Sequence, residues 1–312
     1  MAKADQRRTP LLTWRLEALG YDLITGLIRA LPVETASALG GMALRLIGPM
    51  SSAHRTARTN LRLAFPGLSR TEQDRLLAAQ WENFGRYVFE FPILDRLTPA
   101  SGRVRIIGSE RFDAIKASGK PVIFISGHFT NLEVMPAVIL AAGIACDITY
   151  RAANNPLVDA RIRQSRKRYG VRMFAPKGGD GARDLLQALS AGRSVAMMND
   201  QKYDGGVAGT FFGHPVQTLP AAVRLALKFG VVIQPMSIQR TRGARFVCVL
   251  HDPIGVTPTH DRPADIAAGV AAINHFIETR VRERPQEWWW MHKRWPAEVY
   301  ARAASEAVAQ KP

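Results

Sequence analysis

The chain has 312 residues, of which 47% are hydrophobic and 22% charged, a composition typical of a folded protein with a sizeable core rather than a disordered one. Its formal charge of +16, from 42 Lys and Arg against 26 Asp and Glu, predicts an anionic partner: nucleic acid, an acidic protein, a phosphorylated substrate or an anionic membrane. The two cysteines, Cys146 and Cys248, lie in apolar runs and are expected to be buried free thiols.

The N-terminal part follows a helical pattern. Leucines at helical spacing predict a helix over residues 11–31, and a second apolar stretch runs from Ala36 to Ile47. Charged residues interrupt both, and the longest uncharged window, Thr35 to Leu44, is too short to span a bilayer, which needs roughly 20 residues. Two arrangements remain open. The helices pack on the domain, or they lie in a membrane surface with Trp14 and Tyr21 at headgroup depth.

The next segment carries a basic face formed by Arg55, Arg58 and Arg62. Ser69 and Glu72 then have the spacing of a capping box, which predicts the start of a long helix. Prolines at 92 and 99 mark the boundary between this helical part and the rest of the chain.

From about residue 103 the pattern alternates between short apolar runs and helical segments. The expected strands are 104–107, 122–125, 145–150, 171–174, 195–198, 231–238 and 246–250. The expected helices are 109–118, 131–142, 156–169, 180–191, 219–229 and 264–284. This alternation predicts an α/β fold with a largely parallel central sheet flanked by helices.

One stretch, from Pro121 to Glu133, places polar side chains just after a buried strand. Thr130 or Asn131 is expected to cap the helix that comes next, and His128 lies where open α/β sheets bind ligands. Histidine is suited to proton transfer near neutral pH, and a carboxylate on its far ring nitrogen would fix its tautomer. On spacing alone, a hydrogen-bonded turn residue is the commoner role for such a histidine. Ser126 lacks the glycines of a nucleophile elbow, and no His-Glu-x-x-His pair indicates zinc.

Several separated motifs carry a family resemblance. They are His128-Phe-Thr-Asn-Leu-Glu133, Arg151-Ala-Ala-Asn-Asn155, Asn199-Asp200-Gln201 followed by Phe211-Phe-Gly213, the closing block from Pro285 to Trp295, and Asn60-Leu-Arg-Leu-Ala-Phe-Pro66. In this order, over about residues 10–296, they resemble the lysophospholipid acyltransferase superfamily. More narrowly, they resemble the late acyltransferases of lipid A biosynthesis, which add lauroyl- or myristoyl-type chains. Two features depart from the family: Gln286 and Glu287 stand in reversed order, and no clear spanning helix occurs at the N-terminus.

The resemblance implies a helical, membrane-associating region over 1–98 and an α/β acyltransferase domain over 99–312. It implies transfer of a fatty acyl chain from a thioester, on acyl carrier protein or coenzyme A, to a hydroxyl of a lipid A precursor. This would occur in lipopolysaccharide biosynthesis at the cytoplasmic face of the inner membrane, without a metal or other cofactor. Alternatives are a glycerolipid, aminolipid or glycolipid acceptor. The positive charge also suggests a nucleic-acid-binding protein, but no recognition module is visible in the sequence to support this alternative.

The resemblance also implies roles for individual residues. His128 would act as general base, oriented by Glu133. Substrate-binding roles fall on Arg151, Asn155, Asp200 and Gln201, with Arg151 and backbone N–H groups near Asn131 as candidates for stabilising an oxyanion. Asn155 could equally hold its own loop, and Asp200 could be a turn cap. The basic run that would dock an acidic carrier protein or an anionic lipid consists of Arg161, Arg163, Arg166, Lys167 and Arg168.

Overall fold

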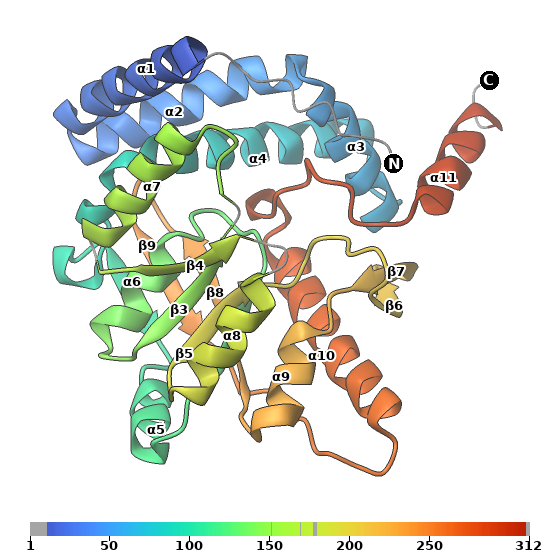
Figure 1. Cartoon of the computed structure of the whole chain (residues 1–312). Helices are drawn as coiled ribbons and strands as arrows, with labels where there is room; N and C mark the ends of the chain where they lie inside the picture. The colour runs from blue at the N-terminus through green and yellow to red at the C-terminus, as the bar shows by residue number, and fades with distance from the viewer. Residues whose placement is uncertain (1–10, 151, 169, 177–179, 310–312) are drawn as a thin grey trace.

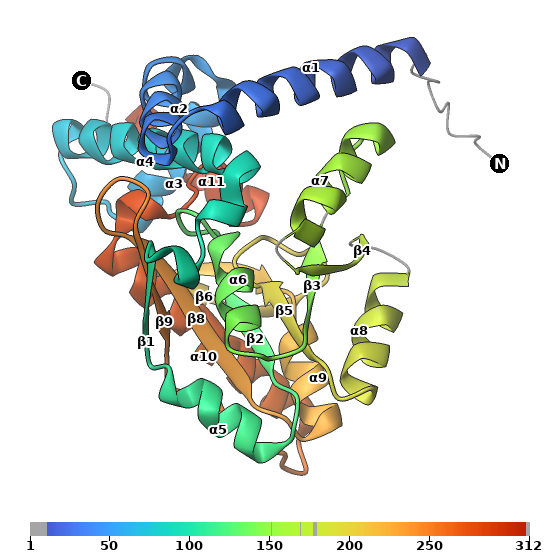
Figure 2. The ribbon, with the colours of Figure 1, turned by 90° about the vertical axis from the view of Figure 1, so that its left-hand side faces the viewer.

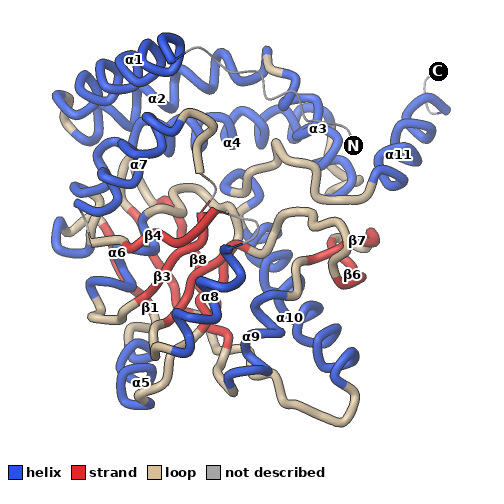
Figure 3. Tube along the Cα trace, viewed as in Figure 1, coloured by secondary structure: helices blue, strands red, loops and turns tan. Residues whose placement is uncertain are grey.

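A sheet forms the centre of the protein, as Figures 1 and 3 show, and it consists of seven strands among the described residues. This computed structural model describes residues 11–150, 152–168, 170–176 and 180–309. The strands, in chain order, are β1 (Val104–Ile107), β2 (Ile123–Ser126), β3 (Cys146–Tyr150), β4 (Arg172–Pro176), β5 (Ser194–Met198), β8 (Ile233–Arg240) and β9 (Phe246–Leu250). Their order in the sheet is β1-β9-β8-β2-β5-β3-β4, and only β8 and β9 pair antiparallel. The predicted α/β fold with a largely parallel sheet is confirmed.

Helices cover the faces of this sheet. They are α5 (Glu110–Ser118), α6 (Val134–Ala141), α7 (Pro156–Arg168), α8 (Asp180–Ser190), α9 (Ala221–Phe229) and α10 (Arg262–Glu283). With both faces covered, the central strand β2 is buried at every position, which is why its sequence is continuously apolar up to Ser126. Cys146 and Cys248 are buried and free, as predicted.

Four helices form a layer at one end of the sheet: α1 (Leu11–Ala30), α2 (Val33–Ile47), α3 (Ser52–Ala64) and α4 (Arg70–Glu90). Short 3₁₀ turns lie at η1 (Gly48–Met50), η2 (Phe91–Arg96), η3 (Pro99–Ser101) and η4 (Pro285–Glu287). The predicted capping box of α4 is confirmed, since Ser69 and Glu72 bond each other's backbone N–H. A Cβ atom on Gly40 of α2 would lie 2.4 Å from the Gly85 carbonyl oxygen of α4, so α2 and α4 touch backbone to backbone.

The outer face of α1 and α2 is apolar and exposed. Figure 2 shows α1 extending from the body of the protein, and the side chains of Leu12, Leu19 and Leu23 are each more than 60% exposed. None of the helices in the described part of the chain combines the length and continuous apolarity that crossing a bilayer requires.

Two elements were not predicted, the hairpin of β6 (Val207–Phe211) and β7 (His214–Thr218) and the last helix, α11 (Ala297–Ala309). The hairpin turn has positive φ at Phe212 (51°) and Gly213 (75°), as a two-residue type I′ loop requires. The predicted start of α6 was wrong. The helix begins at Val134, because the Asn131 side chain donates to Glu90 instead of capping the helix.

Candidate active site

His128 and Asp200 follow two strands that lie side by side in the centre of the sheet. His128 comes just after β2 and Asp200 just after β5, and these strands pair in parallel with Ser126 opposite Met198. Parallel neighbours end at the same edge of a sheet, so the two side chains meet there. Nδ1 of His128 lies 2.7 Å from Oδ1 of Asp200, and the His128 backbone N–H donates to Oδ2 at 2.7 Å.

The Asp200 carboxylate is fully buried and accepts a third hydrogen bond, from Trp288 Nε1 at 2.7 Å. Burial alone would raise the pKa of Asp200, but the electrostatic attraction of the neighbouring His128 and the hydrogen bonds from it outweigh burial and hold the pKa well below its ordinary value. An ionised carboxylate can only accept a hydrogen bond, so Nδ1 of His128 carries the proton and Nε2 carries the lone pair. Nε2 of Gln201 lies 3.5 Å from that second ring nitrogen.

The closing aromatic segment holds the loop that carries His128. The Thr130 backbone N–H donates to the Glu287 carbonyl at 2.7 Å, and the Trp289 backbone N–H donates to the His128 carbonyl at 3.1 Å. Gly127 permits the tight path of this loop, since a Cβ atom there would lie 3.1 Å from Oδ2 of Asp200. The closing segment is therefore a buried support of the site.

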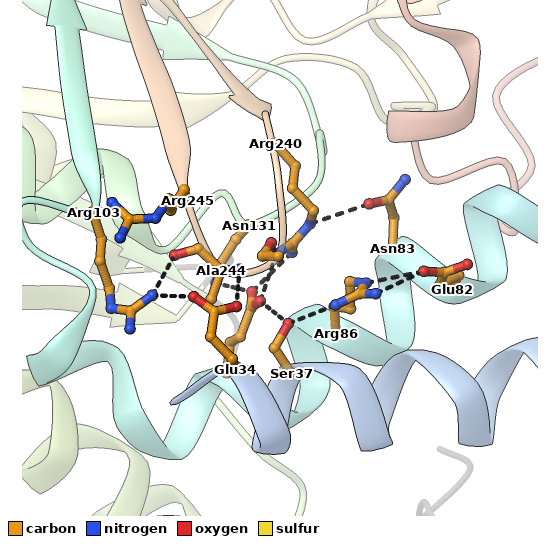
Figure 4. Close-up of polar contacts among 12 residues, drawn as sticks. Glu34, Ser37, Glu82, Asn83, Arg86, Arg103, Asn131, Arg240, Ala244 and Arg245 are labelled. Carbon is orange, nitrogen blue, oxygen red and sulfur yellow. Dashed lines mark hydrogen bonds and ion pairs between the residues drawn. The ribbon is translucent and has the colours of Figure 1, made fainter. Parts of the chain in front are cut away.

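A buried carboxylate, Glu90 of α4, fixes the same loop from the other side. It accepts hydrogen bonds from Asn131 Nδ2 at 2.8 Å, from Ser37 Oγ at 2.7 Å and from both Nη atoms of Arg240, at 2.5 and 2.8 Å. Figure 4 shows this network, in which Asn131, Ser37 and Arg240 converge from the loop, α2 and β8. The helical layer and the sheet are thus joined beside His128.

The partner predicted for His128 was wrong, because the carboxylate on its Nδ1 belongs to Asp200 and not to Glu133. Glu133 is buried just before α6 and forms an ion pair with Arg166, whose Nε lies 3.0 Å from Oε2. The Arg166 guanidinium also lies over the rings of Phe91 and Tyr150, 5.3 and 5.8 Å from their centroids. The spacing of five residues leaves Glu133 beside the helix start, where an arginine of α7 neutralises it.

A cavity of about 270 Å³ opens beside His128. Its walls are mainly apolar and come from β2, β3, β5, β8 and α6, with Phe124, Leu132, Met135, Ile139, Ile148 and Met236 among the lining residues. Polar groups are few, and they include His128, Gln201, Glu133 and Arg166. A mainly apolar cavity with a few polar groups suits a ligand with a long hydrocarbon part.

Other predicted binding residues lie elsewhere. Arg151 falls outside the described residues. Asn155 Nδ2 donates to the Trp14 carbonyl at 3.0 Å and to Glu17 Oε2 at 2.8 Å, so this side chain fastens α1 to the start of α7. It does not line the cavity beside His128.

The predicted basic run on α7 is largely neutralised by the chain itself. Arg161 pairs with Asp22 at 2.6 Å and Arg163 with Asp159 at 3.0 Å, while Arg166 turns inward to Glu133. Lys167 and Arg168 have exposed side chains, and no ion pair among the described residues involves them.

A second histidine, His292, lies beside His128; it belongs to the closing block from Pro285 to Trp295, in which the sequence assigned no role to an individual residue. Its ring centroid lies 5.9 Å from that of His128 and 5.1 Å from that of Trp288. Burial lowers the pKa of His292 to about 4, so this ring is neutral at physiological pH. Among the described residues, no group of three His, Cys, Asp or Glu side chains is placed to hold a metal ion.

Most of the length of this chain is similar to known proteins. The chain matches the family described as bacterial lipid A biosynthesis acyltransferase over residues 9–297. It belongs to this family. The lipid A biosynthesis acyltransferase of Haemophilus influenzae is 24% identical over 272 residues, covering 85% of this chain and 83% of the relative.

Two relatives from Escherichia coli K12 agree. Its lipid A biosynthesis palmitoleoyltransferase is 26% identical over 251 residues, or 76% of this chain and 77% of the relative. Its lipid A biosynthesis lauroyltransferase is 24% identical over 266 residues, or 82% of each chain. The chain is therefore an acyltransferase of the lipid A biosynthesis family.

Proposed function

We propose that this acyltransferase moves a fatty acyl group from a thioester to a hydroxyl of a lipid A precursor, with His128 as the general base and Asp200 orienting it. The observation that carries this is the buried Asp200 carboxylate on Nδ1 of His128, whose ring lines an apolar cavity. Family membership supports acyl transfer in lipid A biosynthesis.

The proposed reaction begins when the acceptor oxygen attacks the thioester carbonyl while Nε2 of His128 takes the hydroxyl proton. The Asp200 carboxylate stabilises the imidazolium so formed. The tetrahedral intermediate then collapses, the carbon–sulfur bond breaks, and the imidazolium returns the proton to the departing sulfur. The apolar cavity beside His128 would hold the acyl chain, and acyl carrier protein or coenzyme A would carry it.

The exposed apolar face of α1 and α2 supports attachment to a membrane surface. Leu16, Leu27 and Leu46 are at least 60% exposed, and isolated soluble proteins rarely leave such a continuous apolar face in water. We propose that both helices lie in the interfacial layer of the inner membrane at its cytoplasmic face, where a lipid acceptor would be within reach.

Purified protein, defined acyl thioesters and a lipid A precursor test this function, with the product weighed by mass spectrometry. Wild type should add one acyl mass to the precursor, and His128→Ala should lose about 10²–10⁴-fold in rate. His275→Ala, at an exposed position of α10, is the matched control. Turnover by His128→Ala at the wild-type rate would refute the proposal.

A further inference from the structure

A second hollow, also of about 270 Å³, lies apart from the cavity beside His128. It sits between α3, α11 and the turn after Trp290, and Figure 1 shows α11 beside the end of the helical layer that contains α3. Arg55, Thr56, Thr59 and Arg62 line it from α3, at spacings that a helix places on one face. Lys293 also lines it, and Ala303 and Ala304 of α11 leave room beside these longer side chains.

Three cations of this hollow lack a carboxylate partner within the described chain. Arg58, on the same helix, pairs with Asp74 at 2.7 Å. By contrast, across the part of the chain that the structure describes, no ion pair includes Arg55, Arg62 or Lys293. The Lys293 ammonium lies 5.7 Å from the centre of the Tyr300 ring, a contact that does not neutralise its charge. Three unneutralised cations around one hollow attract an anion.

The side chains fit a phosphate in particular. The planar fork of an arginine matches two phosphate oxygens at once, and lysine adds a point charge. The Thr59 hydroxyl already donates to the Arg55 carbonyl at 3.1 Å, so Thr56 supplies the hydroxyl donor of the set. Three cations suit the two charges of a phosphate monoester better than the single charge of a diester.

The position of the hollow indicates that the phosphate belongs to a lipid. Met50, 85% exposed, and Leu46, 75% exposed, are on the apolar face of the helical layer, and α3 begins directly after Met50 and Ser51. On the other side, Lys293 follows His292, whose ring lies 5.9 Å from that of His128. We propose that this hollow binds the phosphate monoester of a membrane lipid headgroup, an inference that rests on the proposed membrane attachment.

Vesicle sedimentation tests the site. The full-length chain carrying Arg55→Gln and Arg62→Gln is compared with a control of equal charge, Arg75→Gln with Arg242→Gln, both at exposed positions. The probes are phosphatidylcholine vesicles with phosphatidic acid, a monoester, or with the diester phosphatidylglycerol at matched surface charge. We expect the Arg55/Arg62 variant to lose about tenfold in affinity for phosphatidic acid vesicles and the control to lose little, as for charge-assisted hydrogen bonds.

Equal losses in both variants would show general charge attraction and overturn the proposal. If the Arg55/Arg62 variant lost as much affinity for phosphatidylglycerol vesicles as for phosphatidic acid vesicles, the proposed preference for a phosphate monoester would be refuted. If wild type bound inorganic phosphate with the same affinity as phosphatidic acid vesicles, the proposal that the phosphate belongs to a lipid would be refuted. No acyl donor is present, so the result is independent of turnover. If wild type fails to transfer acyl groups but the Arg55/Arg62 variant loses vesicle binding, the proposed function falls and the phosphate site stands.

Discussion

His128 Nδ1 and Asp200 Oδ1 are 2.7 Å apart although 72 residues separate them in the chain. Replacing Asp200 with Asn keeps the volume but removes the charge that stabilises the imidazolium. We expect Asp200→Asn to lower kcat by about 10⁴-fold, as when the same exchange is made in a serine protease triad. Steady-state rates and a melting curve measure it. A folded variant within tenfold of wild type would show that Asp200 does not orient the base.

The ion pair between Glu133 and Arg166 yields a different expectation. Both side chains are nearly buried, so Arg166→Met leaves an unpaired carboxylate and should lower the free energy of unfolding by about 3–5 kcal/mol. Adding Glu133→Gln should restore much of this stability. Chemical denaturation of the two single variants and the double variant completes the cycle. A double variant whose loss of stability equals the sum of the two single losses would contradict the pairing.

The acyl-chain assignment is tested at Ala196 of β5, which lines the cavity beside His128. A phenylalanine at this position fills part of the cavity, and each methylene that no longer fits costs about 0.8 kcal/mol. Ala196→Phe should therefore prefer shorter acyl thioesters than wild type does, in competition assays read by mass spectrometry. Ala271→Phe, at an exposed position of α10, is the control. An unchanged preference would mean that the chain lies elsewhere.

Membrane attachment depends on the exposed leucines of α1. Leu19→Glu with Leu23→Glu replaces two side chains that are 64% and 63% exposed, so the fold should survive. Since burying a leucine in an apolar layer contributes about 1.5–3 kcal/mol, binding to phospholipid vesicles should fall by more than tenfold. A variant with two glutamates at exposed positions of α10, 271 and 275, corrects for the added charge. Equal losses in both variants would exclude a specific role for α1.

The neutral, half-buried ring of His292 makes stability depend on pH. Its pKa is about 4 in the folded chain against an ordinary 6.5, so between these values the unfolded chain binds more protons. Stability from this group is complete above pH 6.5 and falls as the pH drops towards 4. His292→Asn should flatten that part of the curve, whereas His275→Asn, at an exposed position, should not. Identical slopes in wild type and His292→Asn would disprove this account.

Much of the fold can be predicted from the sequence because the parallel strands are short apolar runs with helices between them. The position of His128 at a strand end could be predicted for the same reason. Its partner, Asp200, could not be predicted, because β2 and β5 are adjacent in the sheet but not consecutive in the chain. No local sequence pattern shows which strands are neighbours. Glu133 is close to His128 in the sequence, whereas Asp200 is close to His128 in space. A useful signal was available, since both His128 and Asp200 directly follow predicted strands.

Two further differences between the predicted and the observed structure have separate causes. The turn at Phe212 and Gly213 contains neither Asn-Gly nor Asp-Gly, so the hairpin lacked its usual marker. The charges of α7 were interpreted as a free basic surface because a sequence does not show that Asp22 and Glu133 lie opposite Arg161 and Arg166.

The contacts between the closing segment and the His128 loop have a consequence for the folding of the chain during translation. Thr130 bonds to Glu287, and Trp288 bonds to Asp200, so the loop and the carboxylate both need residues that are translated after β9, the last strand of the described central sheet. The tryptophans of the closing segment must therefore be synthesised before the imidazole of His128 is held in place. A nascent chain that lacks them has no assembled site of His128 and Asp200.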